Sequence, residues 1–118
     1  PSTRDYLRTV LRVLLPTDVE SRQEATVNIA FFSASTNNKQ FQDLLREGYS
    51  GLLGAVTGHL ETASANGELN PEVSVIQAAA TLFYASQGLV GPVLLDVLSA
   101  RQAMSILDNE LDRIFLTD

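Results

Sequence analysis

The sequence contains no cysteine and only one histidine, His59. Without cysteine, disulfide bonds and thiolate metal sites are excluded. There is also no Glu-x-x-His pair of the kind that binds metals in helical bundles. The acidic residues near the chain end, Asp108, Glu110 and Asp112, point to different sides of a helix, which is typical of a solvated face. We therefore expect a protein that is not an enzyme, with no catalytic residues, no metal site and no cofactor.

Positive charge is scarce in this chain. The sequence has 8 Lys and Arg residues against 14 Asp and Glu, so its net charge is −6 at pH 7. The basic residues are scattered, whereas non-specific affinity for nucleic acid comes mainly from clustered Lys and Arg. The composition thus argues against DNA or RNA binding by these residues alone.

Long uncharged stretches are also rare. One of bilayer length runs from Val73 to Leu95, but it contains serine, threonine and glutamine, and Gly91-Pro92 breaks it before its end. A helix buried within protein is favoured over a membrane span. The charged Arg4, Asp5 and Arg8 are unlike a signal peptide. The start, Pro-Ser-Thr rather than Met, indicates a fragment or a processed product.

Helical periodicity, by contrast, runs along almost the whole chain. Apolar residues recur at gaps of three and four, without strand alternation or an internal repeat. Proline at 16 and the Asn66-Gly67 pair are helix stops. The start signals, in chain order, are Thr17 with Glu20, Asn37 with Gln40, Asn70-Pro71-Glu72, and Ser99 with Gln102. The pattern predicts one all-α domain over residues 1–118, a bundle of about five helices that end near residues 15, 35, 65, 90 and 115.

The second predicted helix carries a polar strip on its apolar side. At about 100° per residue, Phe31 falls to one side of this strip and Ile29 and Phe32 to the other. Asn28 and Ser35 lie between them, opposite the solvent-facing arc. A polar group buried without a partner costs about 1–3 kcal/mol. The strip should therefore find a neighbouring helix, an ordered water or a ligand.

The third and fourth predicted helices have the same character. His59 falls on the apolar stripe of the third, and Tyr84 and Gln87 lie on one side of the fourth. Each residue alone has an ordinary explanation, such as a hydrogen-bonded core histidine. Three helices that each turn aromatic and neutral polar groups inward instead indicate a ligand cavity. The candidate ligand-binding residues are Asn28, Phe31, Phe32, Ser35, Tyr49, Leu52, Val56, His59, Tyr84 and Gln87.

Four glycines, Gly48, Gly51, Gly54 and Gly58, lie inside the third predicted helix. Each lowers helix stability by about 1 kcal/mol relative to alanine. Two explanations are open. The glycines either allow a neighbouring helix to approach closely, or they leave room beside the helix or let it bend.

The order of five helices, together with three short segments, resembles the C-terminal half of TetR-family transcriptional regulators. The segments are Ile29-Ala-Phe-Phe-Ser-Ala-Ser35, Gly67-Glu-Leu-Asn-Pro71 and Ser86-Gln-Gly-Leu89. The resemblance is closest to the subgroup that includes the betaine-pathway repressor, and it covers nearly the whole chain. In that subgroup Phe32 would take the position of a tryptophan, and the amide Gln87 would replace an acid.

The resemblance implies the regulatory domain of a cytoplasmic repressor, which binds a small-molecule effector and forms a homodimer. Operator DNA would be bound only by an N-terminal helix-turn-helix domain that this chain lacks. The last two helices of such regulators normally pair with their twofold mates. The expected interface residues are Val75, Ala78, Ala79, Leu82, Ser86, Leu89, Ala103 and Ile106. A monomer with a central fourth helix is the alternative.

None of the inward polar candidates is a carboxylate, so the expected effector is neutral and largely apolar. A cation held in an aromatic cage of Phe31, Phe32 and Tyr84 is also open. A further alternative is a dimerisation or protein-interaction domain with no small-molecule ligand. A closed cavity lined by Phe32, Tyr49 and Tyr84 would favour an effector, whereas a solid core would favour this alternative.

Overall fold

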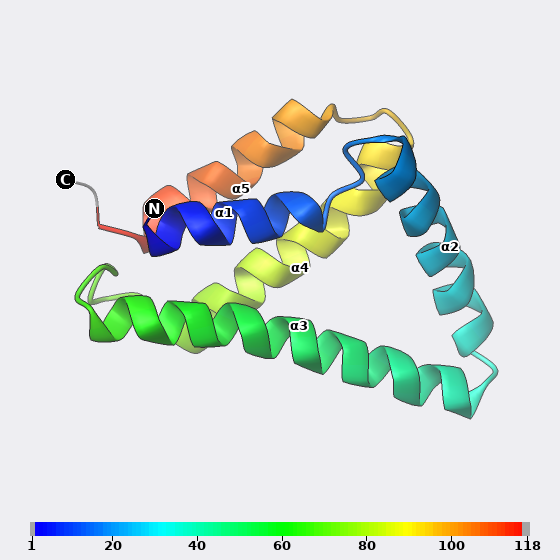
Figure 1. Cartoon of the computed structure of the whole chain (residues 1–118), viewed down its shortest axis with the longest axis horizontal. Helices are drawn as coiled ribbons and strands as arrows, with labels where there is room; N and C mark the ends of the chain where they lie inside the picture. Colours follow the sequence, from blue (N-terminus) through cyan, green and yellow to red (C-terminus); the bar gives the residue numbers. More distant parts are fainter. Residues whose placement is uncertain (1, 117–118) are drawn as a thin grey trace.

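The computed structural model describes residues 2–116, so the predicted domain bounds reach beyond the described residues by residue 1 and residues 117–118. Five helices follow one another along the chain, and the predicted all-α single domain is confirmed (Figure 1). They are α1 (Thr3–Val13), α2 (Val19–Ser35), α3 (Lys39–Ala65), α4 (Val75–Leu94) and α5 (Ala100–Ile114). The principal extents of the molecule are 45 × 31 × 21 Å.

The capping residues differ from the predicted ones by a single position in two helices. Asp18, not Thr17, caps α2: its carboxylate accepts from the Ser21 N–H at 2.7 Å, and the Ser21 hydroxyl accepts from the Asp18 N–H at 3.0 Å. This reciprocal pair forms a capping box, and its hydrogen bonds hold the pKa of Asp18 below the ordinary value. Likewise Asn38, not Asn37, caps α3. The predicted cap of α5, Ser99 with Gln102, is confirmed.

Both predicted ends of the fourth helix are wrong. Asn70 forms a turn, in which its side-chain oxygen accepts from the Glu72 N–H at 3.0 Å, and α4 begins only after Ser74. The turn is tied to the end of α5, because the Asn70 N–H bonds to the Ile114 carbonyl at 2.9 Å. At the other end α4 continues past Val90 to Leu94 with Pro92 in its last turn. Proline near a helix end removes only one bond of the ladder, which the flanking turns can tolerate.

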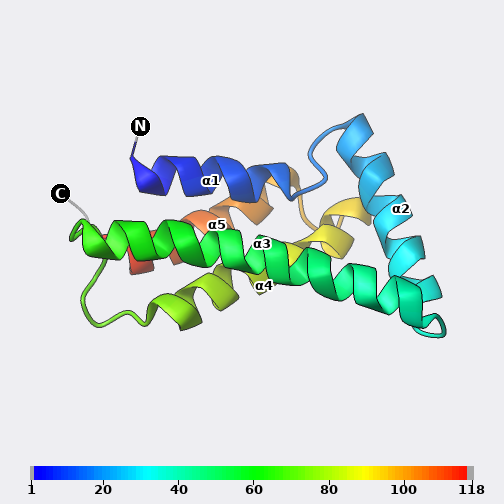
Figure 2. The ribbon, with the colours of Figure 1, turned by 60° about the horizontal axis from the view of Figure 1, so that its bottom comes forward.

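The hydrophobic core occupies one end of the molecule. There α1 lies beside α5 and packs on the C-terminal half of α3, while α5 packs on α4 (Figures 1 and 2). The enclosed apolar side chains of this core include Leu7, Leu11, Leu15, which follows α1, Val56, Leu60, Ala63, Ala79, Leu82, Ala103, Leu107, Leu111 and Ile114. Gly67, with φ of 73°, ends α3 in the left-handed conformation that the sequence predicts.

Helix α2 lies outside this core and crosses the opposite end of the molecule (Figures 1 and 2). Only Ser35 of its 17 residues is buried. The ring of Phe31 packs on Phe41 of α3, with 4.6 Å between ring centroids. At the other end of α2, the Arg22 guanidinium donates to the carbonyls of Val93 and Leu94, at 3.3 and 2.9 Å. These contacts connect α2 to α3 and to the end of α4.

The glycines of α3 do not serve close packing within the chain. A Cβ built on Gly51, Gly54 or Gly58 would meet no heavy atom within 4 Å, and all three positions are exposed. We therefore expect Gly54→Ala to raise the free energy of unfolding by about 0.5–1 kcal/mol, because alanine loses less conformational freedom in a helix. Urea denaturation measures this change. Gly67→Ala is the matched control and should be destabilising, since its φ is positive. A destabilised Gly54→Ala would contradict the exposed environment described for this glycine.

Candidate ligand-binding site

Two hollows open at the end of the molecule that α2 crosses. The larger, here the central hollow, has a volume of about 620 Å³ and is bounded by α2, α3, the C-terminal half of α4 and the connection between α1 and α2. Its lining residues are Val13, Leu14, Leu15, Pro16, Ser21, Glu24, Ala25, Asn28, Ile29, Phe32, Leu44, Leu45, Gly48, Tyr49, Leu52, Gln87 and Val90. The lining is mostly apolar and includes the aromatic rings of Phe32 and Tyr49.

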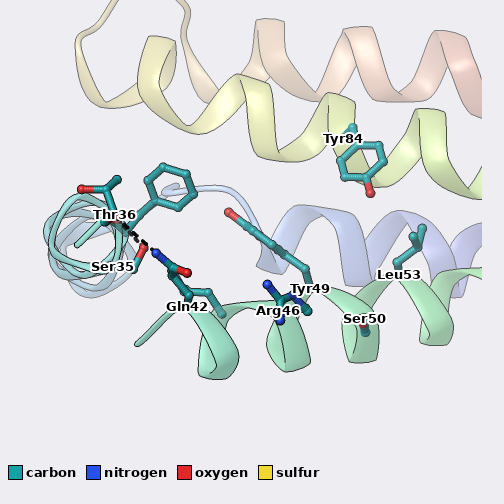
Figure 3. A pocket seen from close by; sticks show the side chains of 10 residues that line it. Ser35, Thr36, Gln42, Arg46, Tyr49, Ser50, Leu53 and Tyr84 are labelled. Carbon is teal, nitrogen blue, oxygen red and sulfur yellow. Dashed lines mark hydrogen bonds between the residues drawn. The ribbon is translucent and has the colours of Figure 1, made fainter. Parts of the chain in front are cut away.

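The second hollow, here the outer hollow, has a volume of about 540 Å³ (Figure 3). It is lined by Phe32, Ser35, Thr36, Gln42, Leu45, Arg46, Tyr49, Ser50, Leu53 and Tyr84. Figure 3 shows Tyr84 reaching from α4 toward α3, while Tyr49 extends from α3 toward α2. Phe32, Leu45 and Tyr49 line both hollows, so the two spaces adjoin at these three side chains.

Seven of the ten predicted ligand-binding residues line one or both hollows. The central hollow has Asn28, Phe32, Tyr49, Leu52 and Gln87, and the outer hollow has Phe32, Ser35, Tyr49 and Tyr84. The other three, Phe31, Val56 and His59, line neither hollow. Phe31 packs on Phe41, Val56 is in the core, and His59 stacks edge-on against Tyr6 of α1 with 4.7 Å between ring centroids.

The predicted polar strip of α2 contains no buried polar group without a partner. The Ser35 hydroxyl donates to the Phe32 carbonyl of its own helix at 2.6 Å, and Asn28 is exposed. Within residues 2–116, no buried side-chain nitrogen or oxygen lacks a partner. The hollows are open and lie beside a solid core, so neither a closed cavity nor a wholly packed bundle describes this domain.

A family model described as the C-terminal domain of BetI-type transcriptional repressors matches residues 3–116. The chain belongs to this family. No curated protein and no solved structure matches the chain. The match confirms the resemblance to TetR-family regulators, and it makes this a regulatory domain and not an enzyme.

Several lining residues of this BetI-type domain were not among the predicted ones. The last residue of α1 and the chain after it, Val13 to Pro16, form one wall of the central hollow, although the sequence marks Pro16 only as a helix stop. Ile29 already shared a side of the predicted helix with Phe32, which is a signal that could have included it. Gly48 also lines the hollow, so at this one position the missing side chain leaves room, as the second explanation of the glycines requires.

Most of the predicted interface residues of the BetI-type domain are enclosed by the single chain. Ala78, Ala79, Leu82, Ser86, Leu89 and Ala103 are buried, Val75 is half-buried against the core, and Ile106 is 46% exposed. The sequence pattern correctly marks a second apolar face on α4, but α1, α3 and α5 cover this face. A side chain that its own chain already encloses has no surface left for a partner. We therefore revise the interface for these six residues.

Among residues 2–116, no group of three or more His, Cys, Asp or Glu side chains is placed to hold a metal ion. None of the helices in that range is both long and apolar enough to cross a membrane.

Proposed function

We propose that the central hollow binds a small, largely apolar effector and that its occupancy regulates DNA binding by an N-terminal helix-turn-helix half of a longer protein. The observation that carries this proposal is the lining of the hollow. Rings of Phe32 and Tyr49 and aliphatic groups of Ile29 and Leu52 surround a few polar groups. Ligand sites of about 300–1,000 Å³ are typically apolar with a small number of orienting polar groups.

The charge of the lining makes a cationic molecule a second candidate for the effector. Glu24 is the one acidic residue that lines the central hollow, and none of the lining residues is Lys, Arg or His. An apolar molecule with one positive charge would find a carboxylate at Glu24 and aromatic faces at Phe32 and Tyr49. A neutral effector needs only hydrogen bonds, for which Asn28 and Gln87 are available. The two candidates differ in their dependence on Glu24.

We infer that α1 responds to an effector in the central hollow and passes the change on to the DNA-binding half. The end of α1 and the residues directly after it contact both the hollow and the core. Leu14 and Leu15 line the central hollow, and Leu15 also belongs to the core with Leu7 and Leu11. An effector that repositions this segment would move α1 relative to α5. For this to regulate DNA binding, the effector must bind the two arrangements of α1 with different affinities.

We further propose a homodimer formed through the outward faces of α4 and α5, in a protein that acts in the cytoplasm, as TetR-family regulators do. The support is a set of large apolar side chains that the chain leaves exposed on these helices and their connection. They are Ile76, Leu95, Val97 and Ile106. Because α4 and α5 pack together, these side chains lie on neighbouring elements, and twofold contacts are the commonest form of homo-oligomer.

A melting screen tests effector binding. A compound at about 100 times its Kd should stabilise the domain by about 2.7 kcal/mol, which raises Tm by several degrees. Phe32→Ala should remove this shift because the ring lines the hollow. Val27→Ala is the matched control, since Val27 is on the same helix, is 66% exposed and lines neither hollow.

The compounds in the screen should include neutral apolar molecules and matched quaternary ammonium analogues. A response that Glu24→Gln abolishes identifies a cationic effector, and one that Glu24→Gln leaves unchanged identifies a neutral effector. Equal shifts in the wild type and Phe32→Ala would contradict the central hollow as the site. No shift with any member of either series would favour a dimerisation or interaction domain.

A further inference from the structure

Helices α1 and α5 are joined by a ladder of ion pairs. Arg4 pairs with Asp112, and Arg8 pairs with Asp108 through two hydrogen bonds of 2.7 and 3.1 Å. The residue number rises by four on α1 as it falls by four on α5, so the helices run antiparallel with one pair per turn. The hydrogen bonds and charge of Asp108 raise the pKa of Arg8 further above its ordinary value.

The next turn of the ladder has an arginine but no acid. Arg12 follows Arg8 by four residues, and the corresponding positions on α5 are Met104 and Ser105. Arg101, three residues before Met104 on α5, adds a second positive charge. Arg8, Arg12 and Arg101 line one hollow of about 460 Å³ together with Thr17, Ala100, Met104, Ser105 and Asp108. Asp108, the acid of this lining, is already held by Arg8.

Neither Arg12 nor Arg101 has an ion pair within residues 2–116. Two guanidinium groups on one hollow repel each other, whereas an anion between them would be attracted by both. The hollow gathers 3 of the 8 basic residues of a chain whose net charge is −6. The third turn of the ladder therefore carries positive charge that is not paired with any acid within residues 2–116.

We propose that this hollow binds an oxyanion, the phosphate or carboxylate group of a small molecule, between Arg12 and Arg101. Guanidinium groups bind both kinds of oxyanion through paired N–H donors, and such charge-assisted hydrogen bonds are about twice as strong as neutral ones. The hydroxyls of Thr17 and Ser105 are further donors on the same lining.

This oxyanion site is separate from the proposed effector site. The two hollows share no lining residue, and the central hollow has no basic group. Both nevertheless include parts of α1 or of the chain that follows it, through Arg8 and Arg12 in one case and Leu14 in the other. Binding at the oxyanion site is thus measurable whatever the central hollow binds.

Calorimetric titration of the 118-residue chain with inorganic phosphate, and in parallel with succinate, tests the proposal at constant ionic strength. We expect saturable binding of one or both anions, with an affinity at least about tenfold weaker in Arg12→Gln and in Arg101→Gln. Phosphate binding alone would identify a phosphorylated ligand, and succinate binding alone a carboxylate. Arg46→Gln is the control, because Arg46 is exposed and pairs with Asp43 at another part of the surface.

A second variant adds the missing acid to the protein itself. Ser105→Asp should raise Tm in the absence of added anion and abolish the response to phosphate and succinate. Binding to the wild type no stronger than that of chloride would overturn the proposal. It would also be overturned if Arg46→Gln weakened binding as much as Arg12→Gln did, or if Ser105→Asp left the response intact.

Discussion

Leu82→Glu is expected to unfold the domain and not merely to separate two chains. The sequence pattern predicts Leu82 at a subunit interface, but its side chain is completely enclosed by the core of one chain. A glutamate there would be charged without a partner or would have to bind a proton. We expect the free energy of unfolding to fall by at least about 3 kcal/mol, a large part of the 5–15 kcal/mol typical of such domains. Circular dichroism during urea titration measures the loss.

Ile106→Glu is the matched control for Leu82→Glu. Ile106 is on α5 and 46% exposed, so a glutamate at this position can remain hydrated in the single chain. We expect this variant to keep its helical content and to weaken the proposed homodimer, which sedimentation at micromolar concentration detects. A well-folded, monomeric Leu82→Glu variant would contradict the arrangement of α4 described here. A monomeric wild type would remove the dimer proposal.

Leu11→Ala should cause the second large loss of stability, about 2–5 kcal/mol, because it leaves a cavity between α1 and the rest of the core. Leu11 is fully enclosed, whereas Val13 on the same helix is 74% exposed. Val13→Ala should therefore change stability by less than about 0.5 kcal/mol. Chemical denaturation compares the two variants.

Hydrogen exchange locates the effect of Leu11→Ala within the fold. If α1 is held mainly by Leu7, Leu11 and Leu15, its amides should lose protection before those of α4. Uniform loss across all helices would instead mean that α1 cannot separate from the bundle. That result would count against α1 as the element that transmits occupancy.

The helices themselves were predictable because their signals are local. Ser99 with Gln102 and the glycine at 67 act within a few residues, and the structure confirms both. The start of α4 was not predictable in this way. Asn70-Pro71 has the composition of a helix start, but the bond from Asn70 to Ile114 at the end of α5 holds this segment in a turn. Contacts across the fold override a local preference of this kind.

For the candidate site, local periodicity likewise carries only part of the information. Periodicity indicates which residues share a side of a helix, so Asn28, Phe32 and Gln87 could be grouped correctly. It does not indicate which neighbour covers that side. His59 and Val56 lie on the apolar stripe of α3, but this part of the stripe faces α1 and the core. The second apolar face of α4 was expected to meet a partner chain, and the structure shows it covered by helices of the same chain, because the same pattern suits either kind of neighbour.

Because α2 lies outside the core, its residues can shape the central hollow without also having to stabilise the fold. Its residues form one wall of the central hollow, yet only Ser35 is buried, and the packed end of the molecule contains none of its large side chains. Substitutions at Asn28, Ile29 or Phe32 can thus alter the shape and polarity of the wall with little change in folding free energy. Related domains can therefore diverge in the molecules they recognise while the other four helices keep the same scaffold.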